Sequence, residues 1–373
     1  MLRRGIPIGR AFGIPLKLHW SWFIIFALVV WALTVGYFPA FYPDWSVELS
    51  VAAALVTSLL FFASILAHEL MHSLLAKSTG LTVHSITLFV FGGVSQLAEE
   101  PKQAKDELRI ALAGPLTSLV LGAIFWAIWF WSRGSIDFLA ATAYWLGLIN
   151  VFVAGFNLIP GFPLDGGRVL RSILWGRSGN LRRATRTASN IGRGFGYLFI
   201  FGGIGLIFWG SWFNGLWLAF IGWFLQSSAV SSYRELAVQD MLKGHRVSAA
   251  MTRDCVTLDA DLTVDELVHR HILTSGRRCF PVAIDNRVVG LVTVHNTKTV
   301  PRERWSTETV GQIMVPIDEV KWVRPDESLS TALQLLTEAD VNQLPVIDDS
   351  AVVGMIARDN ILSFIGIRAE LGV

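Results

Sequence analysis

Two histidines and a glutamate stand close together at residues 68–72, which read His68-Glu69-Leu70-Met71-His72. On a helix, residues four apart lie on one face, so His68 and His72 can bind the same metal ion. Zinc lowers the pKa of a water molecule that it binds to about 7, and Glu69 is adjacent to accept the proton. The spacing also occurs by chance on surface helices. Here it interrupts an apolar stretch, where ionisable side chains are costly unless paired or metal-bound, so we expect one catalytic zinc ion with Glu69 as general base.

A catalytic zinc ion usually has three protein ligands, so a third should lie elsewhere in the chain. The best candidate is Asp165, in a segment that reads Asn-Leu-Ile-Pro-Gly-Phe-Pro-Leu-Asp-Gly-Gly-Arg over residues 157–168. Its prolines and glycines end a helix there and allow Asp165 to turn back toward the other helices. The alternative is that Asp165 only caps a turn, as Asp often does before Gly.

The composition excludes a single soluble globule. Of the 373 residues, 53% are hydrophobic and only 16% are charged, against about 25% charged in a typical soluble chain. The charge-poor stretches end near residue 233, and charged residues and alternating patterns follow. A net charge of +2 indicates no nucleic-acid partner, and two cysteines, Cys255 and Cys279, are too few for a disulfide framework and are expected to stay reduced.

Five apolar segments are candidates for crossing a bilayer, which takes about 20 apolar residues per helix. The last of them divides at Asn214-Gly215, a turn signal, into two shorter spans. We therefore expect a polytopic α-helical membrane domain of about six transmembrane helices over residues 1–232. The apolar segments are residues 18–38, 51–76, 110–130, 138–160 and 196–230.

Lys and Arg gather on one side of these spans, and in membrane proteins that side is the cytosol. The loops on the other side, 39–50, 131–137 and 210–214, hold only Arg133. We expect a multi-pass protein of the cell membrane with both termini in the cytosol. The first apolar run is long for a signal peptide and is expected to be retained. The fifteen residues on the cytosolic side are Arg3, Arg4, Arg10, Lys17, Lys77, Lys102, Lys105, Arg109, Arg168, Arg171, Arg177, Arg182, Arg183, Arg186 and Arg193.

A repeat follows residue 233. Residues 280–290 align with 344–354 at a constant offset of 64, which also brings Asn296 onto Asn360. Each copy reads as strand, turn, strand and helix, and neither could bury its sheet face alone. The layout resembles a tandem CBS pair (a Bateman module), a soluble α/β module with repeats at 238–310 and 311–373.

The membrane domain resembles the site-2 protease family of intramembrane zinc metalloproteases. The resemblance covers residues 1–230 and pairs motifs that lie on separate helices. The matching residues are His68-Glu69-Leu70-Met71-His72, the segment 157–168, Gly13-Ile14-Pro15 with Leu18-His19, Phe91-Gly92-Gly93-Val94, and Ala113-Gly114-Pro115.

This resemblance implies hydrolysis of a peptide bond within the transmembrane segment of another membrane protein, after a first cut elsewhere and with release of a cytosolic regulator. It assigns zinc to His68, His72 and Asp165 and the general base to Glu69. Asn157 matches an Asn near the metal that helps to hold the substrate carbonyl or its oxyanion, and the alternative is a helix-end hydrogen bond. Met71 stands where the family commonly has Gly, which puts the rate or the substrate fit in doubt and not the mechanism.

Residues 83–96 are too few to cross the membrane. By resemblance they form a membrane-dipping loop with an extended segment, Ile86–Phe91, that ends at a bend at Gly92-Gly93. Such an exposed strand edge could capture an unwound substrate segment by β-addition. The equally open alternative is a plug or packing loop.

CBS pairs resemble regulatory sensors that often bind adenine nucleotides. Their ligand signature places a hydroxyl after Gly and two apolar residues, and an Asp two residues later. The first repeat keeps the hydroxyl at Thr293 with His295 in place of the Asp, and the second keeps Asp359 with Ala357 in place of the hydroxyl. Thr293 and Asp359 are thus candidates for binding a nucleotide effector, and the alternative is a docking module or a homodimer interface.

Two other classes of protein fit the sequence less well. A CBS-gated transporter or channel would show internal repeats with broken helices, and residues 1–230 show none. A scaffold that has lost activity is disfavoured because His68, Glu69, His72 and Asp165 are all present. Arg168 and Arg171 are expected to set the orientation of the protein in the membrane and to contact lipid phosphate headgroups.

Overall fold

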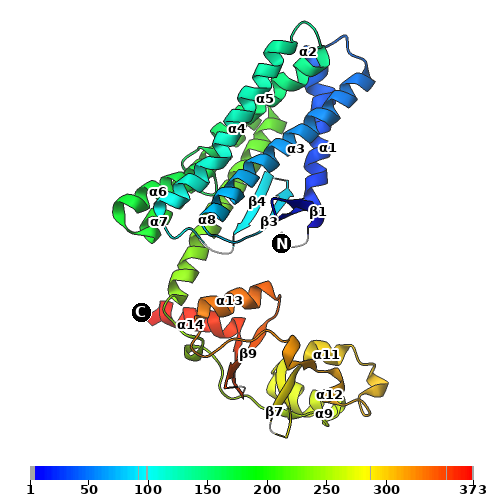
Figure 1. Ribbon diagram of the computed structural model, residues 1–373, viewed down its shortest axis with the longest axis vertical. Coiled ribbons are helices and arrows are strands. Elements are labelled where there is room, and N and C mark those ends of the chain that lie inside the picture. Colours follow the sequence, from blue (N-terminus) through cyan, green and yellow to red (C-terminus); the bar gives the residue numbers. More distant parts are fainter. Residues whose placement is uncertain (1–4, 91, 98–99, 286, 350, 372–373) are drawn as a thin grey trace. The chain divides into compact units, whose positions relative to one another are not determined.

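The computed structural model describes residues 5–90, 92–97, 100–285, 287–349 and 351–371 (Figure 1). Arg3, Arg4 and Phe91, and Asn286 and Ser350 within the aligned repeat segments, lie outside these ranges. The chain divides into two compact units, Met1–Arg234 and Glu235–Val373, each described by itself.

The first unit is a bundle of long helices (Figure 1). Its first apolar segment runs from α1 through a π-helical turn, Leu33–Tyr37, into α2. Helix α3 begins where the Ser46 side chain accepts a hydrogen bond from the Leu49 amide, and Glu48 in the first turn and Lys77 in the last complement its dipole. The helices are α1 (Ser21–Ala32), α2 (Phe38–Phe41), α3 (Val47–Ser78), α4 (Ala104–Ser132), α5 (Asp137–Asn157), α6 (Asp165–Ser178), α7 (Leu181–Phe208) and α8 (Trp212–Leu242).

Within the described residues, five helical segments are long and apolar enough to cross a membrane. The predicted sixth span, the part of 196–230 after the turn, lies in α8. The predicted break at Asn214-Gly215 is wrong, because both residues are inside α8 and the chain turns at Trp209–Ser211, where Gly210 has φ +87°. The five segments are Ser21–Phe41, Val47–Ser78, Ala104–Ser132, Asp137–Asn157 and Leu181–Phe208.

A four-stranded sheet lies beside α3 (Figure 1). Its order is β1-β2-β3-β4, with β2 parallel to β3 and the other pairs antiparallel. The strands are β1 (Ile6–Ala11), β2 (Ile14–Leu18), β3 (Val83–Phe89) and β4 (Gly92–Leu97).

This sheet corrects two expectations. Gly92-Gly93 is not a bend that ends an extended segment but the start of β4. The predicted exposed edge at 86–91 falls largely on β3, which is paired on both sides, by β2 and by β4. Among the described residues β1 pairs with β2 alone and β4 with β3 alone, so β4 is one of the two edge strands.

The second unit confirms the repeat. Strands β6 and β7 of the first copy and β9 and β10 of the second form antiparallel pairs in the same register, with Phe280 opposite Val292 and Leu344 opposite Ile356. The strands are β5 (Leu258–Asp259), β6 (Cys279–Ile284), β7 (Arg287–Thr293), β8 (Val315–Pro316), β9 (Gln343–Asp348) and β10 (Ala351–Ala357). The main helices are α9 (Val264–Glu266), α11 (Val294–Lys298), α12 (Val310–Ile313), α13 (Leu329–Glu338) and α14 (Arg358–Leu371).

The core of the second repeat includes a segment from the start of the first. Leu242 and Val247 pack in the core of the second repeat, with Leu344 and Ile356. Val310 packs in the core of the first, with Phe280 and Val292. Burial raises the pKa of the Cys279 thiol to about 12, so this cysteine stays a neutral, unreactive thiol.

Candidate metal centre

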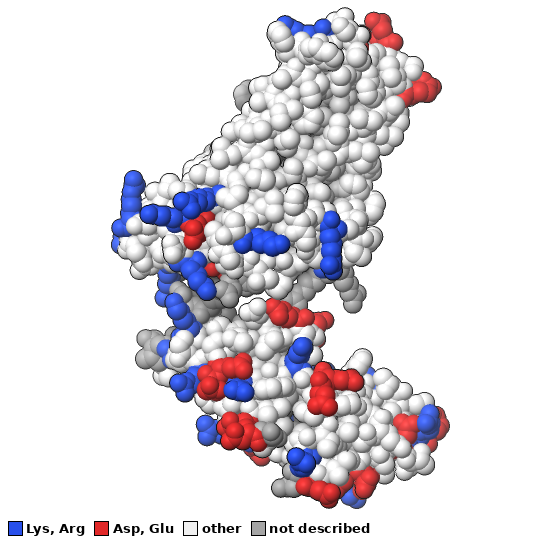
Figure 2. All heavy atoms as spheres, viewed as in Figure 1, with Lys and Arg blue, Asp and Glu red and all other residues white. Residues whose placement is uncertain are grey.

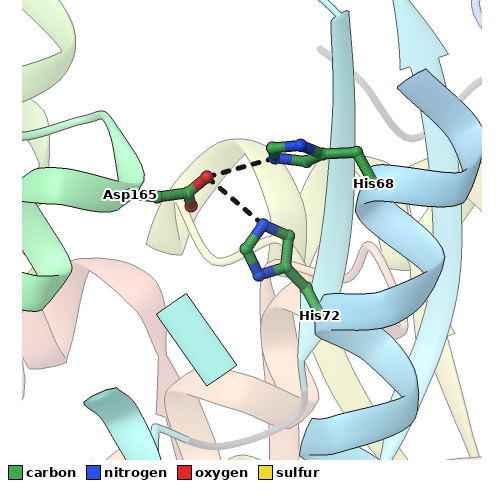
Figure 3. A group of neighbouring side chains, drawn as sticks. All are labelled: His68, His72 and Asp165. Atoms are coloured by element: carbon green, nitrogen blue, oxygen red, sulfur yellow. Dashed lines mark hydrogen bonds and ion pairs between the residues drawn. The ribbon is translucent and has the colours of Figure 1, made fainter. Parts of the chain in front are cut away.

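Three potential metal ligands converge from two helices. His68 and His72 lie one turn apart on α3 and are 4% and 6% exposed, and Asp165 is the first residue of α6. Figure 3 shows both imidazoles facing the Asp165 carboxylate. Asp165 Oδ2 is 3.1 Å from His68 Nε2 and 3.3 Å from His72 Nε2. The structure thus brings together the two predicted parts of the site, which are far apart in the sequence.

The geometry and chemistry of these atoms fit zinc. Two imidazole nitrogens and one carboxylate oxygen form a usual catalytic donor set, and ligands of a tetrahedral zinc ion lie about 3.3 Å from one another. His72 Nε2 is buried and has no hydrogen-bond partner among the described residues. A Cβ atom at Gly114 would overlap with Nε2 of both histidines. Glycine at this position of α4 therefore keeps free the space that an ion would share with the two imidazoles.

The other ring nitrogens of the histidines are held by α4. His72 Nδ1 donates a hydrogen bond to the Ile110 carbonyl at 2.6 Å. In the neutral ring Nε2 then carries no proton, and its lone pair faces Asp165. His68 Nδ1 forms a 2.9 Å hydrogen bond with Ser118 Oγ. Such outer partners orient a metal-binding imidazole and select its tautomer. Sequence reasoning did not find Ile110 or Ser118, since a backbone acceptor and a lone serine leave no local pattern.

Asp165 is placed by close backbone contacts. A Cβ atom at Gly166 would overlap with the carbonyls of Leu158 and Ile159, and one at Gly167 would overlap with the backbone of Gly161. The two glycines after Asp165 thus let α6 begin directly against the loop that follows α5. The expected turn of Asp165 back toward the other helices is what the structure has.

Glu69 lies beside the three ligands and under the sheet. A Cβ atom at Gly93 would overlap with Glu69 Cγ, so the first residues of β4 cross directly over this side chain. Ser73 Oγ, one residue after His72, is 2.7 Å from Ser95 Oγ of β4 and links strand to helix. The open edge at β4 is therefore next to Glu69.

A cavity of about 590 Å³ joins these groups. Its polar part is formed by His68, Glu69, His72, Asp165 and Arg168, and most of the remaining wall is apolar. Asn157, the last residue of α5, also lines it, and its side chain forms no hydrogen bond with another described residue. Met71 is not among the described lining residues. The apolar wall includes Ile25, Val29, Phe61, Ile65, Phe152, Trp217, Ile221 and Phe224.

The two candidate effector residues lie in the second unit. Thr293 caps α11, where its hydroxyl is 2.6 Å from Asn296 Oδ1 in a capping box. Asp359 is in the first turn of α14, beside Asn360, whose Oδ1 accepts from the Ala357 amide. The contacts of the described residues do not join Thr293 to Asp359, and their predicted role is untested.

The chain matches two known protein families. Residues 56–136 and 135–202 match peptidase family M50, and residues 247–296 and 310–367 match the CBS domain. The putative zinc metalloprotease Rip3 of Mycobacterium tuberculosis is 35% identical to this chain, over 98% of this chain and 94% of its own length. The putative zinc metalloprotease sll0528 of Synechocystis is 35% identical, over 97% and 95%.

An archaeal solved structure is also similar. The site-2 protease from Methanocaldococcus jannaschii is 30% identical, covers 62% of this chain and 95% of its own chain, and has a TM-score of 0.45. The full-length sequence relationships show that this chain is a multi-pass zinc metalloprotease with a tandem CBS pair. It belongs to peptidase family M50, the site-2 proteases, as its motifs predict.

We expect Ser118→Ala to weaken zinc binding about 10-fold, because His68 would lose the partner that holds its ring. Competition with a chelator in detergent measures this. Ser132→Ala is the matched control, since Ser132 is also buried on α4 but donates to the Ile128 carbonyl of its own helix. Equal affinity of the Ser118 variant and the wild type would contradict the role of Ser118.

Proposed function

We propose that this protein hydrolyses a peptide bond within the transmembrane segment of another membrane protein, and that the CBS pair regulates it from the cytosol. The observation that carries the proposal is the cavity. It holds three metal-ligand side chains and a glutamate, and most of its wall is apolar side chains from helices long enough to cross a membrane. A soluble peptide would find few polar partners there, whereas an apolar segment suits such a wall.

In this mechanism His68, His72 and Asp165 would hold zinc, which would supply a Lewis acid that lowers the pKa of water and polarises a carbonyl. Glu69 holds the attacking water, accepts its proton and delivers it to the leaving amine. Asn157 faces the same cavity, where its amide donates to the substrate carbonyl as negative charge develops on it.

The open edge of β4 suits capture of the substrate. A transmembrane helix satisfies its backbone hydrogen bonds internally and must unwind before a protease can reach them. The tight β3–β4 hairpin pairs Phe89 with Gly92 and Thr87 with Val94, and alternation in an antiparallel pair directs the backbone of Gly93 and Ser95 outward. A substrate strand added there would pass Glu69.

The charge distribution supports the orientation. Figure 2 shows Lys and Arg of the first unit gathered around the end that carries α6, while the long middle of the bundle is almost free of charge. We assign this end to the cytosol, with both termini and the CBS module. Asp165 begins α6, so the reaction would take place near the cytosolic side of the bilayer.

For the CBS pair we propose repeats at 238–310 and 311–373, after a membrane domain over 1–232. An adenine nucleotide would bind through Thr293 and Asp359 as an effector.

The repeats would also support a homodimer. Light scattering of the detergent-solubilised protein would detect this dimer, and a monomer in that measurement would refute it.

Proteolysis and metal binding can be separated by two variants. Glu69→Gln should retain zinc and lose at least about 100-fold in cleavage, because general base catalysis is removed, whereas Asp165→Ala should lose zinc affinity. The assay uses a single-span membrane protein lacking its extracytoplasmic domain, reconstituted with the protease in proteoliposomes, with products identified by mass spectrometry. Glu48→Gln, an exposed change at the far end of α3, is the control. Undiminished cleavage by the Glu69 variant would refute its role as base.

The edge-strand role predicts a difference between two changes at one residue. Ser95→Ala removes only the contact with Ser73, while Ser95→Pro also removes the outward amide. We expect Ser95→Pro to cleave about 10-fold more slowly than Ser95→Ala, with equal zinc content, since one backbone hydrogen bond to the substrate is lost. Equal rates for the two variants would leave β4 as a packing strand.

The effector role predicts that AMP binds the full-length protein and that Asp359→Ala weakens this binding about 10-fold, because a hydrogen bond to the ribose is lost. Isothermal titration calorimetry in detergent measures the affinity. Asp349→Ala, in the β9–β10 turn, is the control. No heat of binding with AMP, ADP or ATP would refute an adenine-nucleotide effector.

A further inference from the structure

A buried ion pair connects α4 to the helix that begins with Asp165. Glu107 on α4 is 0% exposed and Arg171 on α6 is 4% exposed. Arg171 Nε donates to Glu107 Oε1 at 2.7 Å, and Arg171 Nη2 contacts the same oxygen. Arg171 Nη1 lies 3.3 Å from Glu100 Oε1. Because Arg171 is buried and paired, the expectation that it serves lipid headgroups is wrong.

The same guanidinium contacts the chain on both sides of Asp165. Arg171 follows Asp165 by less than two helical turns, and its guanidinium lies over the ring of Phe162, 5.1 Å from the centroid. Phe162 precedes Asp165 by three residues and is itself packed against Ala188 and Ala229. The loop and the first turns of α6 are therefore fixed to one point, the carboxylate of Glu107.

Stability alone does not account for such a pair. A buried ion pair is often no more stable than two well-packed apolar residues, while the planar guanidinium fork holds its partner in one orientation. Asp165 needs that precision, because it follows a loop with two prolines and its carboxylate must meet two imidazoles held by another helix. We propose that the Arg171–Glu107 pair is a positioning device that holds Asp165 at the metal-binding distance from His68 and His72.

The inference rests on the proposed role of Asp165 as a metal ligand, and the test measures metal binding without any substrate. Co²⁺ is titrated into the full-length protein in detergent, and affinity is read from the absorption of the bound ion. Arg171→Lys keeps the charge and loses the fork, and the double variant Glu107→Leu/Arg171→Met removes both charges together. Arg177→Met is the control, since Arg177 is on the same helix and exposed.

We expect Arg171→Lys and the double variant each to bind Co²⁺ about 10-fold more weakly, and Arg177→Met to bind as the wild type does. Thermal unfolding of the double variant should stay close to that of the wild type, because both buried charges are removed together. Arg168 Nε, 3.8 Å from Glu107 Oε1, also loses this partner, but its side chain is partly exposed to solvent. Hydrogen exchange of the metal-free protein gives a second readout, with faster exchange of residues 158–170 in Arg171→Lys.

Wild-type affinity and exchange in Arg171→Lys, or wild-type affinity in the double variant, would overturn the proposal and leave the pair a packing contact. Asp165→Ala, measured in parallel, separates the ligand role of Asp165 from the positioning role of the Arg171–Glu107 pair. If it binds Co²⁺ as the wild type does, the ligand assignment itself fails. If it loses affinity while the Arg171 variants do not, only the positioning role fails.

Discussion

The structure depends on one constraint. Three polar side chains, those of His68, His72 and Asp165, must meet inside a largely apolar bundle and must be held there rigidly. Helix α4 meets this constraint with one face. Glu107, Ile110, Gly114 and Ser118 are spaced by three, four and four residues, so they share one side of the helix. Glu107 binds Arg171 of the Asp165-bearing helix, Ile110 and Ser118 hold the two imidazoles, and Gly114 leaves the space between them. Helix α3 thus carries two of the three candidate ligands, but contacts with α4 set where all three lie.

The spacing of residues in the sequence was enough to find the side chains that could do chemistry. It was not enough to find the contacts that hold these side chains in place. His68 and His72 follow from the helical period, and Asp165 from a segment rich in Pro and Gly beside an apolar span. The Arg171–Glu107 pair joins residues 64 positions apart, and nothing near either residue indicates its partner. The same holds for the parallel pairing of β2 with β3, because α1–α3 separate Leu16 from Ile86 in the sequence.

The wrong predictions of a bend at Gly92-Gly93 and of a turn at Asn214-Gly215 have separate physical causes. Two glycines suggested a bend at 92–93, but only Gly92 has positive φ, at +125°, and Gly93 is needed because Glu69 lies against it. Asn214-Gly215 suggested a turn, but a Cβ atom at Gly215 would overlap with the Gly203 carbonyl of α7. Gly93 allows β4 to lie against the Glu69 side chain, and Gly215 allows the backbones of α7 and α8 to approach each other. A single sequence does not distinguish such glycines from those of a turn.

The candidate catalytic groups of α3, Glu69 and the two imidazoles, face backbone on two sides. Gly93 of β4 covers Glu69, and Gly114 of α4 faces the two imidazoles. Backbone cannot change rotamer, so a wall made of it holds catalytic groups more rigidly than a wall of flexible side chains. The remaining walls of the cavity are apolar side chains of α1, α3, α5 and α8, which can change rotamer. The fold therefore combines a rigid polar centre with adaptable apolar walls.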